Sequence, residues 1–229
     1  MQGTIQSPPD LAPYIDHTLL KADASEQDII RLCEEALKHG FKAVCVNPTF
    51  VGLTRKHLAH SKILSAAVVG FPLGTHLARV KALEAELAVG DGAGEIDMVI
   101  RIDLVKARDW RAVEADIASV VKASGVAGVK VILETGLLSQ DEIVGACKAS
   151  EAAGAAFVKT ATGFLGRGAT IEDIRLMRAT CSSSVKIKAS GGVKTFAQAA
   201  ELIAAGADRL GTSSGIFLVS GDGAASAGY

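Results

Sequence analysis

Short apolar runs rich in β-branched residues alternate with longer stretches of helical periodicity along the whole chain. The runs centre near Tyr14, Val44, Ala67, Asp97, Val131, Val158, Ile187 and Leu210. Consecutive centres lie about 23–34 residues apart, which is a natural length for one strand followed by one helix. Eight such units predict a closed parallel barrel with its helices on the outside.

The helical stretches carry their own start and stop signals. In the first of them Ser25 precedes an apolar stripe, Asp28 follows three residues later, and Gly40 marks the end. These are the features of an N-cap, a first-turn acid and a C-terminal glycine. The same logic predicts further helices over residues 109–123, 139–153, 171–180 and 195–205.

An open doubly wound sheet is the alternative fold, and it would carry a glycine-rich dinucleotide turn after its first strand. Here Asp16, His17 and Thr18 follow the first predicted strand instead. We therefore expect a single (β/α)8 TIM barrel, an α/β fold, as one domain over residues 1–229. The residues from about 220 to 229 are mostly Gly, Ala and Ser, and predict a flexible tail that ends in Tyr229.

Composition narrows the class of protein. With 229 residues, 49% of them hydrophobic, the chain is long enough for strands that are buried on both faces. A net charge of -1 gives no electrostatic reason to expect nucleic acid or an anionic membrane as partner. The four scattered cysteines favour free thiols in a reducing compartment, and neither a signal peptide nor a membrane-spanning run is visible. The expectation is a soluble, cytoplasmic protein.

Lys159 stands at the end of an apolar strand, where barrel enzymes collect their chemistry. Burial disfavours the charged form of a lysine, and the neutral amine is the nucleophile that forms a Schiff base with a carbonyl. The alternative is a lysine that extends from the strand end into solvent, which is the commoner situation for an isolated residue of this kind.

Three further strands carry ionisable residues among apolar neighbours. Lys186 and Lys188 share one face of strand seven, and Lys188 is nearer the catalytic end, where it can lie beside Lys159 and lower its pKa. Lys186 is expected near the barrel floor or turned outward. Asp97 would be satisfied by pairing with Lys188, which gives either a proton relay or an ordinary buried ion pair. Asp16 is a candidate member of the same network.

Two glycine- and serine-rich loops follow strands seven and eight. The first contains Gly191 and Gly192, and the second, over residues 211–215, opens what looks like a short final helix. Loops at these two places form the recurring phosphate site of such barrels. The sequence therefore predicts a phosphorylated small-molecule substrate, with Gly191, Gly192, Ser213, Ser214, Gly215 and Thr160 as its phosphate-binding residues.

Seven motifs, in the same order, resemble those of the deoxyribose-phosphate aldolase family over essentially the whole chain. They are Ile15–Leu20, Val44–Pro48, Val69–Gly74, Glu95–Val99, Val158–Thr160, Lys188–Gly192 and Gly211–Gly215. The resemblance implies reversible cleavage of 2-deoxy-D-ribose 5-phosphate to D-glyceraldehyde 3-phosphate and acetaldehyde. It implies a class I reaction, through a Schiff base and without metal or cofactor.

Residue roles follow from the resemblance, motif by motif. It implies that Lys159 is the Schiff-base lysine, that Asp97 donates and accepts protons, and that Lys188 is the second proton-handling lysine. Tyr229 matches the family's C-terminal tyrosine, whose tail can reach the active site to assist proton transfer. A homodimer or higher homo-oligomer is the default expectation for assembly.

Some positions depart from the family's usual pattern, namely Arg101, Asp103, Gly136, Leu165 and Arg167. Arg167 could add charge for a phosphate or simply face solvent. Two other functions stay open at this level. A sugar-phosphate isomerase or epimerase would need only an acid/base pair, and a catalytically silent barrel would bind a sugar phosphate without turnover.

Overall fold

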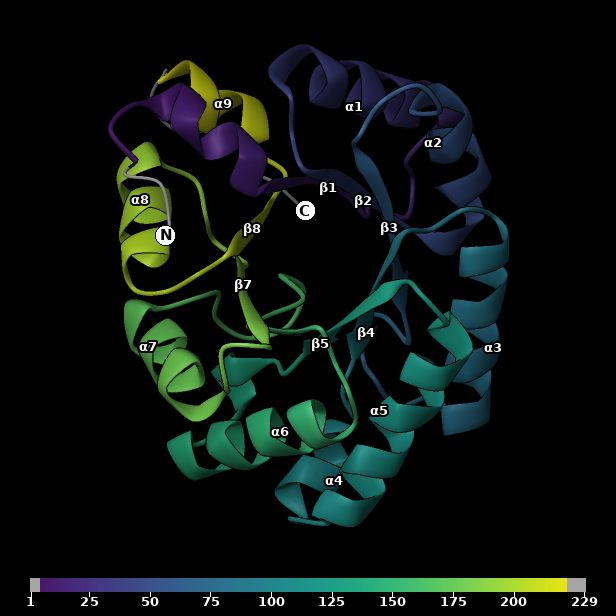
Figure 1. Ribbon diagram of the computed structural model, residues 1–229, viewed down its shortest axis with the longest axis vertical. Coiled ribbons are helices and arrows are strands. Elements are labelled where there is room, and N and C mark those ends of the chain that lie inside the picture. Colours follow the sequence, from purple (N-terminus) through teal and green to yellow (C-terminus); the bar gives the residue numbers. More distant parts are fainter. Residues whose placement is uncertain (1–4, 222–229) are drawn as a thin grey trace.

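Eight parallel strands close into a barrel, in which each strand pairs with the next along the chain and β8 pairs with β1 (Figure 1). The computed structural model describes residues 5–221. The strands are β1 (Ile15–Leu19), β2 (Ala43–Val46), β3 (Leu64–Val69), β4 (Glu95–Val99), β5 (Gly128–Ile132), β6 (Phe157–Lys159), β7 (Lys186–Ser190) and β8 (Arg209–Thr212). The predicted TIM barrel is confirmed.

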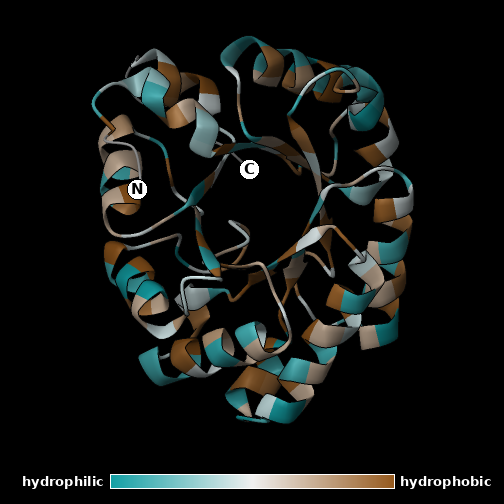
Figure 2. Cartoon of the chain, viewed as in Figure 1, coloured by the Kyte–Doolittle hydropathy of each residue, from teal (hydrophilic) through white to brown (hydrophobic). Residues whose placement is uncertain are grey.

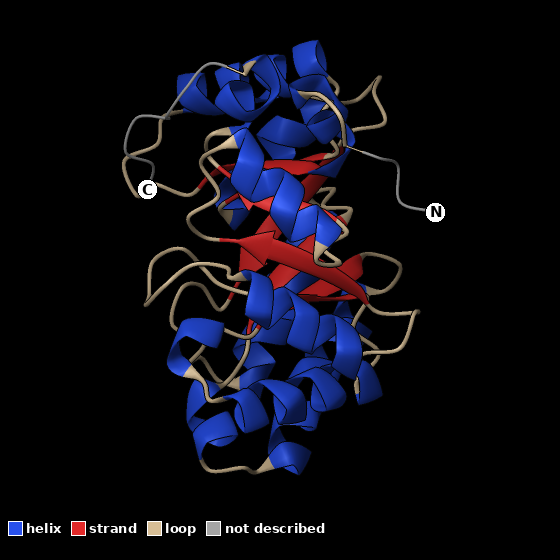
Figure 3. Cartoon of the chain, turned by 90° about the vertical axis from the view of Figure 1, so that its left-hand side faces the viewer, coloured by secondary structure: helices blue, strands red, loops and turns tan. Residues whose placement is uncertain are grey.

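Helices surround the barrel in both views of the chain (Figures 1 and 3). The α-helices are α1 (Glu26–His39), α2 (Val51–His57), α3 (Ala78–Gly90), α4 (Ile102–Lys106), α5 (Trp110–Ser124), α6 (Gln140–Ala152), α7 (Ile171–Thr180), α8 (Phe196–Ala204) and α9 (Gly215–Ser220). Three short 3-10 helices are η1 (Pro8–Tyr14), η2 (Pro48–Phe50) and η3 (Thr135–Leu137). Within residues 5–221, none of the helices has both the length and the apolar character that crossing a membrane requires.

The predicted helix ends are present as capping interactions. The backbone N–H of Asp28 donates to the Ser25 hydroxyl, while the Asp28 carboxylate accepts from the Ser25 backbone N–H at 3.0 Å. Gly40 ends the same helix with φ at 69°, a left-handed conformation that glycine adopts without a steric penalty. The predicted helix over residues 171–180 coincides with α7.

The prediction for the first strand was wrong by several residues. Tyr14 ends η1, and the strand occupies Ile15–Leu19, so Asp16 lies within β1 rather than after it. Pro8, Pro9 and Pro13 explain the difference, because proline fixes φ near the helical value and favours a turn of helix over an extended strand. The predicted tail falls on residues that include 222–229, which lie outside the described part of the chain.

The apolar core lies between the barrel and the helices, whereas charged side chains fill part of the barrel interior. Ile96, Met98, Val131 and Ile187 are fully buried members of that core. In Figure 2 hydrophilic stretches are visible on barrel strands inside the ring of helices. Seven buried charged residues pair with one another there: Asp16, Glu95, Asp97, Lys130, Lys159, Lys188 and Arg209. We call these seven residues the axial network.

Candidate active site

Strand register brings the two predicted catalytic lysines together. Lys159 at the end of β6 is the Cα partner of Lys188 in β7, as the sequence predicted for neighbouring strands. On the other side of β5, Asp97 in β4 is the Cα partner of Lys130. Because side chains two residues apart share a face, these strands turn their charged residues towards the same axis. The barrel therefore gathers side chains that are far apart in the sequence.

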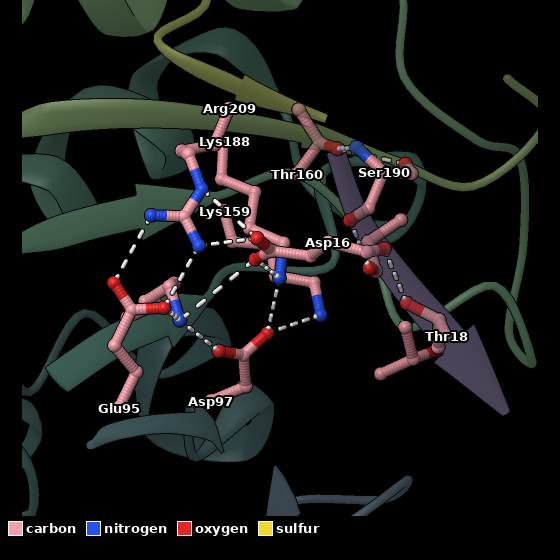
Figure 4. A network of polar contacts seen from close by, with 12 residues as sticks. Asp16, Thr18, Glu95, Asp97, Lys159, Thr160, Lys188, Ser190 and Arg209 are labelled. Carbon is pink, nitrogen blue, oxygen red and sulfur yellow. Dashed lines mark hydrogen bonds and ion pairs between the residues drawn. The ribbon is translucent and has the colours of Figure 1, made fainter. Parts of the chain in front are cut away.

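Asp97 is the centre of this arrangement (Figure 4). Its Oδ2 accepts hydrogen bonds from the Nζ of Lys159 at 2.8 Å and from the Nζ of Lys188 at 2.7 Å. Its Oδ1 accepts from the Nζ of Lys130 at 2.8 Å. The pairing that was predicted between Asp97 and Lys188 is present. One carboxylate thus holds three amines at hydrogen-bonding distance.

The rest of the axial network continues from Lys188 towards the amino ends of the strands. The Nζ of Lys188 lies 2.6 Å from Oδ2 of Asp16, and Asp16 in turn accepts from the guanidinium of Arg209, with Nε at 2.9 Å. Arg209 also donates to both carboxylate oxygens of Glu95, at 3.1 and 2.8 Å. Asp16 therefore belongs to the network, as the sequence suggested, and fixes Lys188 from the side opposite Asp97.

Charge counting shows why one amine of the axial network favours its neutral form. The network holds four cationic side chains (Lys130, Lys159, Lys188 and Arg209) and three carboxylates (Asp16, Glu95 and Asp97). All seven are buried, so an excess positive charge is poorly solvated. With one lysine neutral, three cations face three anions. Among residues 5–221, Lys159 makes an ion pair only with Asp97 and is the member with the fewest opposing charges.

The pKa shifts agree with this count. Burial lowers the pKa of Lys159, and nearby Lys188 lowers it further, although Asp97 opposes both effects. Burial acts on Lys188 in the same direction, but Asp16 and Asp97 together outweigh it and raise its pKa. Burial alone would raise the pKa of Asp97, yet Lys130, Lys159 and Lys188 hold it well below its ordinary value. The site therefore pairs an amine that loses its proton easily with one that keeps it.

Burial separates Lys159 from a lysine that merely extends into solvent. Lys159 is 3% exposed and Lys188 is fully buried, while Lys186 is exposed at the opposite end of β7. The Nζ of Lys186 lies 5.6 Å from the ring centroid of Phe157, near the barrel floor. The interpretation of Lys159 as a solvated strand-end lysine is wrong, and Lys186 lies near the barrel floor, which is one of the two positions expected of it.

The loops after β7 and β8 come together as the sequence predicted. Gly192, Ser213 and Ser214 line one small pocket together with Lys194. The Thr212 hydroxyl ties the loops to each other, because it donates to the carbonyl of Val193 at 2.8 Å and accepts from the backbone N–H of Ser214 at 2.9 Å. Gly191 and Gly192 have φ of 83° and 74°, which favours glycine at both positions.

Two of the predicted phosphate residues have additional roles in packing. The Thr160 hydroxyl donates to the carbonyl of Ser190 and accepts from its backbone N–H, both at 2.9 Å, so it anchors the strand that leads into Gly191. A Cβ on Gly215 would stand 2.9 Å from Nδ1 of His17, so only glycine fits at the start of α9. Tyr229 lies outside the described residues.

Four of the five positions that depart from the family pattern have specific local contacts, and nothing in the structure explains Leu165. Arg167 donates to both carboxylate oxygens of Asp173, at the start of α7, and is therefore engaged with that helix. Arg101 and Asp103 pair with each other at 2.7 Å. A Cβ on Gly136 would meet the backbone nitrogen of Arg167 at 2.8 Å, so the loop after β6 packs directly on this glycine.

Sequence reasoning missed four charged residues of the site: Glu95, Lys130, Glu134 and Arg209. Lys130 stands between Val129 and Val131, and Glu95 lies two residues before Asp97 on the same strand face. The rule that identified Lys159, an ionisable residue within an apolar strand, would have found Lys130 and Glu95 as well. Glu134 follows the strand and carries no comparable signal.

Comparison with known proteins shows which family this chain resembles. The model of the DeoC/LacD family aldolases matches residues 11–219. Among curated relatives, the deoxyribose-phosphate aldolase of Histophilus somni is 49% identical over 93% of this chain and 95% of its own length. The enzyme of the same name from Thermococcus gammatolerans is 50% identical over 93% of this chain and 96% of its own.

A solved structure agrees with these relatives. The tetrameric deoxyribose phosphate aldolase from Aeropyrum pernix superposes with a TM-score of 0.88 at 32% identity, and the match covers 95% of this chain and 92% of that one. The barrel, the paired lysines around one carboxylate and the full-length match to curated relatives lead to a single assignment. This chain belongs to the DeoC/LacD family of aldolases.

Proposed function

We propose that this protein is a deoxyribose-phosphate aldolase, which cleaves 2-deoxy-D-ribose 5-phosphate reversibly to D-glyceraldehyde 3-phosphate and acetaldehyde. Curated relatives of this name, 49% and 50% identical over nearly the whole chain, support the substrate. The observation that carries the chemistry is the contrast between two buried lysines that share Oδ2 of Asp97. One has a lowered pKa and the other a raised pKa.

In the proposed reaction the neutral Nζ of Lys159 attacks the aldehyde carbon C1 of the open-chain sugar. Proton transfers that involve Lys188 and Asp97 release the C1 oxygen as water and leave an iminium. The C3 hydroxyl then loses its proton, its oxygen forms a carbonyl, and the electrons of the C2–C3 bond move into the iminium. Glyceraldehyde phosphate departs, and the enamine that remains is protonated at carbon and hydrolysed to acetaldehyde.

The division of roles follows from the contacts. Lys188 stays charged between Asp16 and Asp97, so it can donate a proton to the departing oxygen and recover one later. Asp97 holds both amines and carries the negative charge that balances them. We assign Tyr229, as the resemblance implies, to assistance in proton transfer.

For the phosphate we propose Gly191, Gly192, Ser213, Ser214 and Gly215 as binding residues. The pocket shared by the loops after β7 and β8 supports this assignment, and Lys194 lines it with a positive charge. Thr160 contributes through Ser190, which it holds with two hydrogen bonds. Backbone N–H groups in glycine-rich loops suit an anion because they approach it closely.

Reduction of the Schiff base by borohydride tests the proposed function. With acetaldehyde present, we expect mass spectrometry to find an ethyl group on the peptide that contains Lys159. Lys159→Leu should lose both the adduct and the cleavage of deoxyribose phosphate. Lys186→Leu is the matched control, because this lysine is exposed at the far end of the adjoining strand and should leave both intact.

Adduct formation distinguishes the aldolase from its rivals. An isomerase or a silent binding protein would bind the sugar phosphate without being trapped. A label on another lysine, or normal cleavage by Lys159→Leu, would refute the proposed role of Lys159.

We further propose that the protein forms a homo-oligomer through the outer face of α3. Val80, Leu83 and Leu87 recur on one side of this helix and are 43%, 54% and 60% exposed, which is unusual for large apolar side chains. Leu73 and Leu77 extend the patch towards the preceding loop. The tetrameric relative from Aeropyrum pernix supports a second copy of the chain as the partner.

Charge complementarity favours a two-fold contact at this face. Arg79 and Glu86 are exposed and lie two turns apart on α3. When two such helices pack antiparallel about a two-fold axis, Arg79 faces the partner's Glu86.

The free, buried state of all four cysteines supports a further proposal, that the enzyme works in the reducing cytoplasm.

A further inference from the structure

Glu134 is a buried carboxylate that the proposed mechanism does not use. It follows β5 by two residues, is fully buried, and has φ and ψ of 57° and 56°, a left-handed conformation that residues other than glycine rarely adopt. Main-chain hydrogen bonds hold it on both sides, since Leu133 N–H donates to the Lys159 carbonyl and Thr135 N–H donates to the Thr160 carbonyl. The backbone thus fixes Glu134 beside the Schiff-base strand.

The two carboxylate oxygens of Glu134 have different surroundings. Oε2 accepts hydrogen bonds from the backbone N–H of Thr162 at 3.1 Å and from its hydroxyl at 2.5 Å. Oε1 is buried and has no hydrogen-bond partner among the described residues. A buried charged oxygen without a donor is costly, and such atoms are uncommon in folded proteins. Oε1 is therefore an acceptor that awaits a donor.

Other buried atoms without a hydrogen bond, within residues 5–221, lie in different surroundings. Asp16 Oδ2 is satisfied electrostatically by Lys188 at 2.6 Å. His17 Nδ1 faces Gly215 outside the barrel axis, and Asp116 belongs to the pair with Lys81 behind β4. Glu134 alone among these four is attached to the loop that follows the Schiff-base lysine.

Strand register places Glu134 beyond Lys159 in the direction of the barrel mouth. Ile132 is the Cα partner of Lys159, and Glu134 stands two residues further along the chain. A substrate joined to Lys159 through C1, with its phosphate at the loops after β7 and β8, extends in that same direction. Beyond the cleaved C2–C3 bond, C3 becomes the new aldehyde carbon, and the next carbon, C4, carries the hydroxyl group that remains on the aldehyde product.

We propose that Oε1 of Glu134 accepts a hydrogen bond from the C4 hydroxyl of the bound sugar phosphate and so selects α-hydroxy aldehydes as acceptors. This inference rests on the proposed function, because it assumes a substrate linked to Lys159. Oε2 keeps the loop after β6 in place through Thr162, whose hydroxyl oxygen also accepts from the backbone N–H of Phe164 at 3.1 Å. Glu134 thereby joins loop position to substrate recognition.

The electrostatics of Glu134 suit an acceptor that is filled by substrate. The pKa of Glu134 is raised, because burial outweighs the two hydrogen bonds from Thr162 and the nearby Lys159, which lower it. A hydroxyl donor would stabilise the carboxylate in the same way as Thr162 does. The residue is distinct from Asp97, which already accepts from three lysines.

Glu134→Gln separates recognition from loop support. The glutamine oxygen can still accept both hydrogen bonds from Thr162, but its NH2 group replaces Oε1 and cannot accept a hydrogen bond. Each enzyme is assayed for addition of acetaldehyde to D-glyceraldehyde 3-phosphate and to 3-phosphooxypropanal, which lacks the α-hydroxyl. We expect kcat/KM to fall by about tenfold to a hundredfold with the first acceptor, since a charged hydrogen bond is lost. It should change less than about twofold with the second, which offers no donor at that position.

An equal loss of kcat/KM with both acceptors would refute hydroxyl recognition and assign Glu134 to loop support. An unchanged kcat/KM with both acceptors would also refute hydroxyl recognition. Borohydride trapping of acetaldehyde by Glu134→Gln is measured in parallel, and we expect it to persist at Lys159. If the unmodified enzyme is not trapped, the proposed function fails instead, so the two failures are distinguishable. The same melting temperature in both enzymes confirms that the fold is intact.

Discussion

At the scale of single residues, the axial network assigns opposite behaviour to two chemically identical side chains. The Nζ atoms of Lys159 and Lys188 lie at nearly equal distances from Oδ2 of Asp97, 2.8 and 2.7 Å. Only Lys188 has a second carboxylate, that of Asp16, at 2.6 Å. Because both lysines are buried, this one additional partner decides which amine retains its proton.

A substitution at Lys188 tests this division. Lys188→Met removes a cation that lowers the pKa of Lys159, so that pKa should rise and the acid limb of the pH–rate profile should move to higher pH. Loss of the proton-transfer group should also lower kcat by about a hundredfold to ten-thousandfold. Steady-state kinetics of the cleavage across a pH series measure both effects. Lys188→Arg is the control that keeps the charge, and an unmoved acid limb in Lys188→Met would contradict the assigned electrostatics.

Charged residues in apolar strands could be recognised from the sequence, but their partners could not. Lys159, Asp97 and Lys188 were predicted because each stands among apolar neighbours, where an unpaired charge is costly. That Lys130 shares Asp97 depends on the register of β4 and β5, and that Arg209 bridges Asp16 and Glu95 depends on barrel closure. No local pattern encodes either of these. The left-handed conformation of Glu134 is equally invisible in a sequence.

At the scale of elements, the most reliable predictions were those with an end signal. The first helix was located by its cap residues and its terminal glycine, and α7 was located to the residue. The strand near Tyr14 was misplaced because a proline-containing 3-10 helix leads directly into β1. Short elements such as α4 have no periodicity to detect, since five residues complete little more than one turn.

The loops after β6 and β7 contact each other, so a substitution in the first is expected to displace the second. The backbone N–H of Ala169, after β6, donates to the Gly191 carbonyl at 3.1 Å, and a Cβ on Gly168 would stand 2.1 Å from that same oxygen. Gly168→Ala must therefore displace the loop after β7, which we propose binds the phosphate. We expect KM for deoxyribose 5-phosphate to rise about tenfold, the effect of losing roughly one hydrogen bond, while KM for unphosphorylated deoxyribose changes little.

Steady-state kinetics with the two sugars measures this ratio. Gly52→Ala is the matched control, because a Cβ there meets no atom within 4 Å. If Gly168→Ala affected both sugars equally, the loop after β7 would have no special role in phosphate binding.

At the scale of the whole molecule, the barrel has two kinds of apolar surface. One is sealed between strands and helices, and the other lies exposed along α3. A helix whose outer face carries Val80, Leu83 and Leu87 would lower its free energy by burying them against a second copy. This face could not be predicted from the sequence, because apolar residues occur all around α3 and do not distinguish its buried side from its exposed side.

Introduction of negative charge into this apolar surface tests the proposed assembly. Leu83→Glu combined with Leu87→Glu should convert the oligomer to monomers, because carboxylates cannot be buried in an apolar contact without a large cost. Analytical ultracentrifugation measures the mass of each form. Val126→Glu is the control, since Val126 is fully exposed and lies outside the patch. A monomeric unmodified protein, or an oligomer that survives both substitutions, would refute α3 as the interface.

The surplus of one cation in the axial network also bears on the direction of chemical change. In the proposed reaction a neutral Lys159 leaves the buried charges balanced, whereas its conversion to a protonated imine restores an uncompensated positive charge in a medium that solvates it poorly. Scission of the carbon–carbon bond delivers electrons that turn this cation into an uncharged enamine. The interior thus raises the energy of the covalent cation relative to that of the uncharged enamine, which favours the bond-breaking step of the proposed reaction.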